Sequence, residues 1–151
     1  MANEKLIQVV DLCKSYHKLD VIKHISVDFS KNEVVSIIGP SGGGKSTFLR
    51  CMNLLEKPSS GQILFNGVDI CAKDQSKYID QHRQKMGMVF QQFNLFNNMT
   101  VMKNLTAAPV RIKGMDKKQA EDKAIELLGR VGLADRADAY PDQLSGGQKQ
   151  R

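Results

Sequence analysis

The sequence lacks the features that mark secreted and membrane-spanning chains. Its first residues, MANEKLIQVVDL, contain no basic segment followed by a long apolar run and a small-residue cleavage site, so no secretory signal is visible. No apolar stretch approaches the ~20 residues that a membrane helix needs. We therefore expect that the chain neither spans a membrane nor leaves the cytoplasm by the secretory route.

Cysteine is also scarce, and its spacing suggests no pairing. The three cysteines, Cys13, Cys51 and Cys71, are odd in number, far apart and outside any Cys-x-x-Cys spacing. Repeats, low-complexity tracts and linkers are absent as well. These absences predict buried or half-buried free thiols in a reducing compartment, in a chain with the length of one domain.

What is present is the composition of a globular domain. Hydrophobic residues make up 41% of the 151 residues and charged residues 25%, which argues against disorder or a fibre. The net charge of +6 would suit nucleic acid, an anionic membrane surface or a polyphosphate ligand. Because lysine and arginine are scattered along the chain, an ordinary solvated surface is the favoured interpretation of this charge.

Strand patterns dominate the first part of the chain. Residues 6–12 and 24–29 have the composition of strands. Residues 33–39, EVVSIIG, are nearly continuous in Val and Ile, which predicts a strand buried on both faces. The Asn66-Gly67 step within GQILFNGVDI predicts a tight hairpin turn.

Helical patterns follow the glycine-rich loop and become dominant later. Residues 45–53 predict a short helix, residues 74–86 a polar helix, and GMVF a brief strand between that helix and the second half. We expect the chain to divide into a β-rich part with the loop, residues 1–92, and a helical part, residues 93–151.

The clearest helix covers residues 115–131. Asp116 can cap its start with Gln119 three residues on, and Gly132 ends it. One apolar stripe runs along it, which predicts ordinary core packing. The stripe consists of Ala120, Ala124, Leu127, Leu128 and Val131.

The segment GPSGGGKST, residues 39–47, matches the phosphate-loop pattern G-x-x-x-x-G-K-[ST]. The predicted strand before it and helix after it supply the required context, because the turn aims backbone N–H groups and a positive helix end at one point. Glycines let the backbone curl around phosphate oxygens without Cβ clashes. The predicted nucleotide-binding residues are Gly39, Ser41, Gly42, Gly43, Gly44, Lys45, Ser46 and Thr47.

The polar side chains of this loop have separate predicted roles. Lys45 reaches the β- and γ-phosphates, the Ser46 hydroxyl ligates Mg²⁺, and Thr47 adds a donor near the α-phosphate. The pattern predicts binding of a nucleoside triphosphate with Mg²⁺, but it does not predict which process the nucleotide drives. No apolar run after the loop ends in Asp, so the second acidic group that hydrolysis needs is missing from the sequence.

A second glycine-rich segment, LSGGQ, lies close to the last residue. Ser145 and Gln148 form a predicted capping box, while Gly146 and Gly147 leave the first backbone donors bare. This predicts a second anion-binding helix end, far along the chain from the first. Since barely one turn of sequence follows, we expect this helix start to be frayed.

Taken together, GPSGGGKST, MGMVFQQFNLF and LSGGQ resemble the ATP-binding-cassette (ABC) transporter ATPases, specifically the polar amino acid uptake branch, over essentially the whole chain. The resemblance implies an α/β fold: a P-loop NTPase core with an antiparallel β subdomain and an α-helical signature subdomain, truncated before the Walker B strand. It also implies a head-to-tail dimer, in which the phosphate loop of one subunit and the LSGGQ segment of the other enclose the same ATP.

The resemblance assigns two further residues. Tyr16 matches the aromatic residue that stacks on adenine, with an ordinary edge-strand tyrosine as the alternative. Gln91 matches the glutamine that contacts Mg²⁺ and the region of the attacking water, with Gln92 as the competing assignment. Lys45 and Gln91 are thus the expected catalytic residues. The Walker B aspartate, the catalytic glutamate and the switch histidine of the family are absent.

The loop FNLFNNMTV looks like the surface on which such proteins meet the membrane subunit. Its large apolar residues are either that exposed contact or simple core: Phe93, Leu95, Phe96 and Met99. The resemblance implies a second ATPase subunit, permease subunits bound through residues 93–100, and indirectly a substrate-binding protein, with no nucleic acid. It implies a peripheral place on the cytoplasmic side of the cell membrane.

Three functional hypotheses are open at this point. The favoured one is the ATPase subunit of a polar amino acid importer, represented by an incomplete chain. The others are a soluble cassette ATPase that acts on nucleic acid, and a nucleotide-binding module without catalysis. We expect residues 1–151 alone to be marginally stable or aggregation-prone, to bind ATP weakly and not to turn it over.

Overall fold

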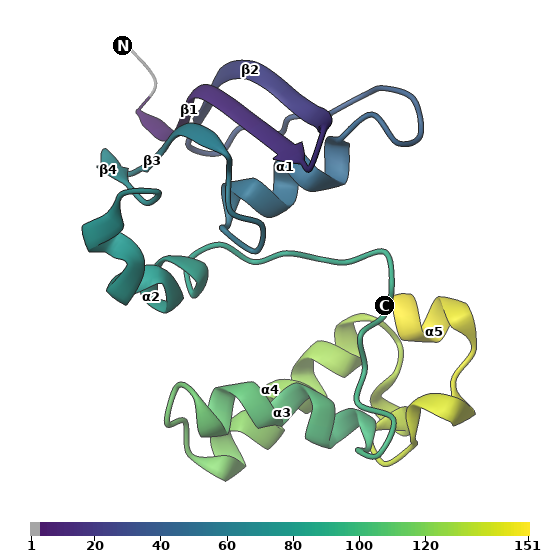
Figure 1. Cartoon of the computed structure of the whole chain (residues 1–151). Coiled ribbons are helices and arrows are strands. Elements are labelled where there is room, and N and C mark those ends of the chain that lie inside the picture. The colour runs from purple at the N-terminus through teal and green to yellow at the C-terminus, as the bar shows by residue number, and fades with distance from the viewer. Residues whose placement is uncertain (1–3) are drawn as a thin grey trace. The chain divides into compact units, whose positions relative to one another are not determined.

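The computed structural model describes residues 4–151, shown in Figure 1. The chain forms two compact units that divide between Met88 and Val89, and each is described here by itself. The N-terminal unit holds the strands and the phosphate loop, and the C-terminal unit is helical. The boundary expected from the sequence, between residues 92 and 93, lies a few residues further along.

The N-terminal unit is built on an antiparallel sheet of order β2-β1-β3-β4. Its long strands are β1, Lys5–Tyr16, and β2, Leu19–Ser30, which form a hairpin with Tyr16 opposite Leu19. The strands predicted over residues 6–12 and 24–29 are therefore confirmed, and both are longer than predicted. Figure 1 shows this hairpin lying across helix α1, Lys45–Met52.

The predicted Asn66-Gly67 turn is also confirmed. It joins β3, Ser60–Phe65, to the short strand β4, Val68–Asp69. Both turn residues are left-handed, with φ of 50° at Asn66 and 78° at Gly67. Such a two-residue turn matches the twist of the strands that it connects.

Packing of α1 on one face of the sheet makes the core of this unit. Phe48 and Cys51 of the helix are buried against residues that alternate along the strands, among them Val9, Leu12 and Ile63. Full burial of such a side chain stabilises the fold by about 1.5–3 kcal/mol. The position of α1, and with it the end of the phosphate loop, is therefore set by the sheet.

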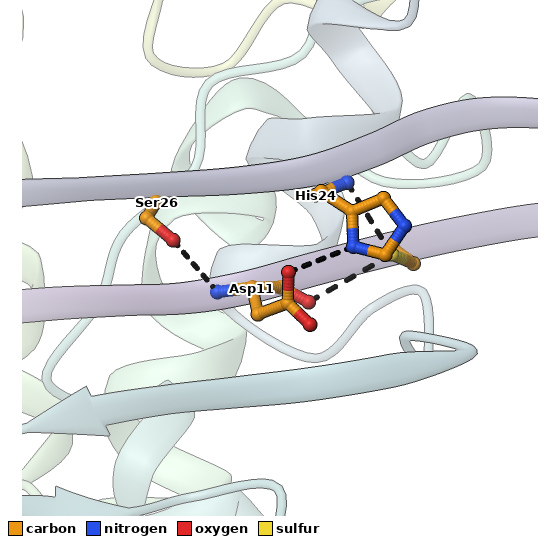
Figure 2. Close-up of polar contacts among 4 residues, drawn as sticks. Asp11, His24 and Ser26 are labelled. Carbon is orange, nitrogen blue, oxygen red and sulfur yellow. Dashed lines mark hydrogen bonds and ion pairs between the residues drawn. The ribbon is translucent and has the colours of Figure 1, made fainter.

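A double irregularity interrupts the pairing of β1 with β2 (Figure 2). Asp11 and His24 both have positive φ, 50° and 51°, and His24 Nδ1 lies 2.8 Å from Asp11 Oδ1. The Asp11 amide donates to Ser26 Oγ at 2.9 Å, and the His24 amide to Cys13 Sγ at 3.3 Å. Side chains thus satisfy the amides that the ladder leaves unpaired. The His24–Asp11 contact is part of this irregularity, and both side chains are exposed.

The strand predicted over residues 33–39 is wrong for this structure. The segment has no regular secondary structure, and Val34 and Ile38 are more than nine-tenths exposed. A strand buried on both faces needs neighbouring strands for its N–H and C=O groups, and within residues 4–151 no segment pairs with it. With β2 and Phe48, the segment lines an apolar groove of about 500 Å³.

The short strand predicted at GMVF is wrong for the same reason. No described strand pairs with it, and Val89 is 87% exposed. The polar helix predicted over residues 74–86 is partly confirmed, as a 3₁₀ helix, Lys73–Tyr78, followed by α2, Ile79–Arg83. Arg83 Nη2 donates to the carbonyl of Leu54 at 2.6 Å, so this segment ties the connection that follows α1.

The C-terminal unit contains a helix pair, two 3₁₀ turns and a short last helix. Helix α3, Val101–Arg111, is capped by Thr100. Helix α4, Lys117–Arg130, is capped by Asp116, whose carboxylate accepts from the amides of Lys118 and Gln119. The predicted cap and helix are therefore confirmed. Of the predicted stripe, Ala120, Ala124 and Leu128 are buried, whereas Leu127 is 41% exposed at its edge.

The rest of this unit runs through 3₁₀ turns at Ala134–Arg136 and Pro141–Gln143 to helix α5, Gly146–Gln150. Leu133 and Leu144 of these connections are buried. Across the described part of the chain, no helix has both the length and the apolar character needed to cross a bilayer.

The Cys51 thiol gives a test of the α1 packing. Burial raises the pKa of Cys51 from 9.0 to about 11. Between pH 9 and 11 the unfolded chain loses this proton while the folded chain keeps it, so the free energy of unfolding falls with pH across that window. Below pH 9 the group has no such effect. Urea unfolding at a series of pH values measures the slope.

Cys51→Ala provides the control. It removes the titrating thiol and leaves the other alkaline groups in place, so the decline from pH 9 to 11 should be shallower than in the parent chain. Identical slopes in the two proteins would show that Cys51 is not protected in the native state.

Candidate nucleotide site

The phosphate loop owes its shape to left-handed glycines and a helix start. Gly42 and Gly44 have φ of 77° and 80°, and the Gly43 amide donates to the carbonyl of Pro40 at 3.1 Å. Helix α1 begins directly after Gly44, with no side-chain cap. The first amides of a helix have no partner within it, and here none is supplied by a capping side chain. They are available to an anion.

Gly44 also fixes the loop against the sheet. A Cβ at this position would lie 3.0 Å from both Cγ1 and the carbonyl oxygen of Val21 in β2. Only a residue without a side chain allows this approach at a left-handed φ. The loop and the β1–β2 hairpin are therefore in direct contact within the N-terminal unit.

The Lys45 ammonium lies across the loop. Its Nζ donates to the carbonyls of Gly39 at 2.9 Å and Pro40 at 2.7 Å. Within residues 4–151 no carboxylate forms an ion pair with it. The positive charge is thus held by neutral acceptors, which phosphate oxygens can replace with stronger charge-assisted hydrogen bonds. Ser46 is exposed and Thr47 half-buried in the first turn that follows.

Tyr16 lies in the same unit, at the end of β1. Its partner across the hairpin is Leu19, two residues before the Val21 that contacts Gly44. The side chain is 38% exposed, and Lys14 Nζ lies 4.7 Å from the centroid of its ring. The structure therefore brings Tyr16 to the hairpin that supports the phosphate loop.

The remaining predicted residues belong to the C-terminal unit. Gln91 and Gln92 are both exposed and outside regular structure, so exposure does not separate the two assignments. At the LSGGQ segment the predicted capping box is confirmed. The Gln148 amide donates to Ser145 Oγ at 3.3 Å, and Gln148 Oε1 accepts from the Ser145 amide at 2.8 Å.

The expected fraying of this helix start is wrong for this structure. Helix α5 is formed from Gly146 to Gln150, and Gly146 and Gly147 leave open space where side chains would lie. Arg151 Nη1 donates to the carbonyl of Val131 at 2.9 Å. The capping box and this contact with the end of α4 stabilise the short helix.

The loop FNLFNNMTV is ordered yet exposes two rings. Phe93 is 43% and Phe96 59% exposed, so these two are not core residues of the unit. The Asn104 side chain holds the loop through the amide of Phe96, at 2.8 Å, and the carbonyls of Phe96 and Met99, each at 3.1 Å. The sequence analysis missed Asn104, because a single Asn in a helical pattern gives no local signal.

These features define a class of protein. A glycine-rich loop between an apolar segment and a helix start, with a lysine over the loop, is typical of the phosphate-binding element of the P-loop NTPases, which are α/β proteins. A protein-family model described as "ABC transporter" matches residues 22–151. The chain belongs to this family.

Individual relatives agree with the family. The arginine transport ATP-binding protein ArtM of Bacillus subtilis is 49% identical over 97% of this chain and 60% of its own length. HisP of Escherichia coli, a histidine/lysine/arginine/ornithine transport ATP-binding protein, is 45% identical over 99% of this chain and 62% of its own. The chain thus spans about three-fifths of the length of these relatives.

A solved structure agrees with the fold. The dimeric post-hydrolysis state of the ATP-binding cassette MJ0796, bound to ADP and Pi, matches with a TM-score of 0.84 at 31% identity. The match covers 95% of this chain and 65% of that one.

Gly44 and Gly42 provide a matched test of the loop. Gly44→Ala places a methyl group against Val21 at a left-handed φ, so it should lower the free energy of unfolding by about 2 kcal/mol or more. Gly42→Ala has the same φ but open space, so it should cost only about 1 kcal/mol. Urea unfolding of both variants measures the difference. Equal losses would mean that Gly44 does not contact β2.

Proposed function

We propose that this chain is the nucleotide-binding part of an ABC importer's ATPase subunit, which couples binding and hydrolysis of MgATP to the uptake of polar amino acids. The observation that carries the proposal is the Lys45 ammonium, held over a glycine-rich loop at a helix start by the carbonyls of Gly39 and Pro40. The class of transported substrate rests on the relatives, whose names describe arginine and histidine/lysine/arginine/ornithine transport.

The site suits a triphosphate. The free amides at the start of α1 and the positive end of the helix favour phosphate oxygens. Lys45 exchanges the carbonyls of Gly39 and Pro40 for the β- and γ-phosphates, which neutralises part of their charge. Thr47 adds a donor near the α-phosphate, and the Tyr16 ring stacks on the base. The binding residues are Gly39, Ser41, Gly42, Gly43, Gly44, Lys45, Ser46 and Thr47.

Mg²⁺ fits this arrangement as a partner of the nucleotide. The described residues contain no cluster of three or more His, Cys, Asp or Glu side chains that could hold a metal ion. The exposed Ser46 hydroxyl and the phosphate oxygens would supply oxygen ligands of the kind that this ion prefers. The resemblance to the family adds Gln91 as a further ligand. Bound there, Mg²⁺ would neutralise charge on the β- and γ-phosphates.

The second half of each ATP site comes from a partner subunit in this proposal. Ser145, Gly146, Gly147 and Gln148 present a second helix start with bare amides, which would face the γ-phosphate bound by the other subunit. The dimeric state of the related cassette MJ0796 with ADP and Pi supports this view. Gln91 would orient the attacking water, and catalysis would require acidic groups that residues 1–151 do not supply.

The exposed rings of Phe93 and Phe96 suit a docking surface for the permease. An apolar pair on a loop that Asn104 holds in place would present a preformed contact. A substrate-binding protein would act through that permease. These partners place the protein peripherally on the cytoplasmic side of the cell membrane.

Lys45→Ala tests the nucleotide site. Loss of the ammonium should weaken binding of MgATP by about 100-fold or more, since a charge-assisted contact to two phosphates disappears. Isothermal titration calorimetry measures it. Lys23→Ala, which removes an exposed lysine of β2 with no ion pair among the described residues, should leave the affinity unchanged. Equal affinities for the parent chain and Lys45→Ala would refute the assignment of the loop.

A chimera tests the transport function. Residues 1–151 are joined to the remaining C-terminal part of ArtM and expressed in Bacillus subtilis that lacks its own ArtM. Since the two chains are 49% identical over the matched region, the chimera should restore arginine uptake. The Lys45→Ala chimera should not. A folded chimera that hydrolyses ATP without restoring uptake would contradict the importer assignment while leaving the ATPase intact.

A further inference from the structure

Lys14 has an environment unlike that of the other ion-paired lysines. Its side chain is only 12% exposed, and Nζ lies 2.7 Å from Glu56 Oε1, at 29% exposure. The same Nζ donates to the carbonyl of Lys57 at 2.8 Å and lies 4.7 Å from the centroid of the Tyr16 ring. By comparison, Lys5 of the same strand and its partner Asp28 of β2 are 52% and 43% exposed. Because water screens the Lys14–Glu56 pair less than the Lys5–Asp28 pair, the attraction between its charges is stronger.

Both partners are charged at neutral pH. The hydrogen bond from Lys14 lowers the pKa of Glu56, and a smaller effect of the Tyr16 hydroxyl lowers it further. The same bond from Lys14 to Glu56 raises the pKa of Lys14. With a carboxylate, a carbonyl and a ring around it, the ammonium has one defined place. An ammonium so close to the ring centroid fixes how the ring is oriented.

The anchor of Lys14 is the segment that follows the phosphate-loop helix. Glu56 and Lys57 come shortly after the end of α1, and the Glu56 amide donates to the carbonyl of Arg50 in its last turn at 3.0 Å. Ser59 extends the contact. Its amide donates to the carbonyl of Cys13 at 2.9 Å, and its Oγ accepts from the amide of Ser15 at 3.0 Å. The phosphate loop therefore leads into the start of α1, and the segment that follows the end of α1 contacts the end of β1, where Tyr16 lies.

The Tyr16 ring needs such support. It lies at the last residue of β1 and is 38% exposed. A ring that is already oriented loses less conformational freedom when a ligand stacks on it, which strengthens binding. With the ammonium on one side, the opposite face is the one on which a flat base can stack.

We propose that Lys14 and Glu56 are positioning residues, which orient the Tyr16 ring for stacking on the nucleobase and tie it to the helix of the phosphate loop. The proposal rests on the nucleotide-binding function proposed above. It concerns the base and not the phosphates. Stacking alone accepts any purine, so the pair contributes affinity for a base without reading its polar edges.

Two ligands separate the base from the phosphates. MgATP and Mg-tripolyphosphate, which has no base, are titrated into the parent chain and into Lys14→Met. Loss of the ammonium should weaken binding of MgATP about five- to tenfold, because only a part of the stacking energy is lost. Binding of tripolyphosphate should not change. Glu56→Gln should act in the same direction, and Lys14→Arg should restore most of the affinity for ATP.

Lys5→Met is the matched control, since it breaks a lysine–carboxylate pair of the same strand away from Tyr16. It should change neither affinity. Tyr16→Ala should weaken binding of ATP at least as much as Lys14→Met does, because it removes the stacking partner itself.

A spectroscopic signal follows the ring directly. The chain contains no tryptophan, so in Tyr16→Trp all tryptophan emission comes from position 16. MgATP should quench this emission and tripolyphosphate should not. In the Tyr16→Trp, Lys14→Met double variant the half-maximal quench should require about five- to tenfold more ATP.

The outcomes are distinct. Equal losses for ATP and tripolyphosphate in Lys14→Met would show a merely structural role and overturn the proposal, as would unchanged affinity for ATP. If Lys45→Ala and Tyr16→Ala weaken the binding of ATP while Lys14→Met does not, the nucleotide site is supported and the positioning role is refuted. If Lys45→Ala has no effect, the proposed function itself fails.

Discussion

The packing of α1 against the antiparallel sheet is the contact on which the N-terminal unit depends. Phe48 and Cys51 fix the helix, and Gly44 brings its start against Val21 of β2. The uncapped amides at that start and the Lys45 ammonium, which lies over the loop, are the groups of the proposed phosphate site. Without this packing, the loop would have no fixed position against the sheet.

Several turns and helix caps could be predicted from the sequence because they are local. The Asn66-Gly67 turn, the Asp116 cap and the Ser145–Gln148 capping box each need only a few neighbouring residues, and each has the predicted form. The two strands at residues 33–39 and 87–90 failed, since a strand depends on a partner and no described segment pairs with them. Their apolar composition was real, but composition does not supply a neighbour.

The charges of the site show the same division. The phosphate-loop pattern pointed to Lys45 from the sequence alone. The places of Lys14 and Glu56 depend on residues far apart in the chain, one in β1 and the other after α1. Asn104 likewise acts on a loop eight residues earlier. No motif marks these three side chains, because each works through a contact formed only when the chain folds.

By itself the sequence determined the phosphate loop, the capped helix starts and membership of the ABC transporter family, because short patterns of glycine, lysine and hydroxyl residues fix local backbone geometry. Only the tertiary structure decided which apolar segments pair, how Lys45 lies over the loop and what surrounds Lys14. Those outcomes depend on burial and on hydrogen-bond partners brought from distant positions, which no local pattern encodes.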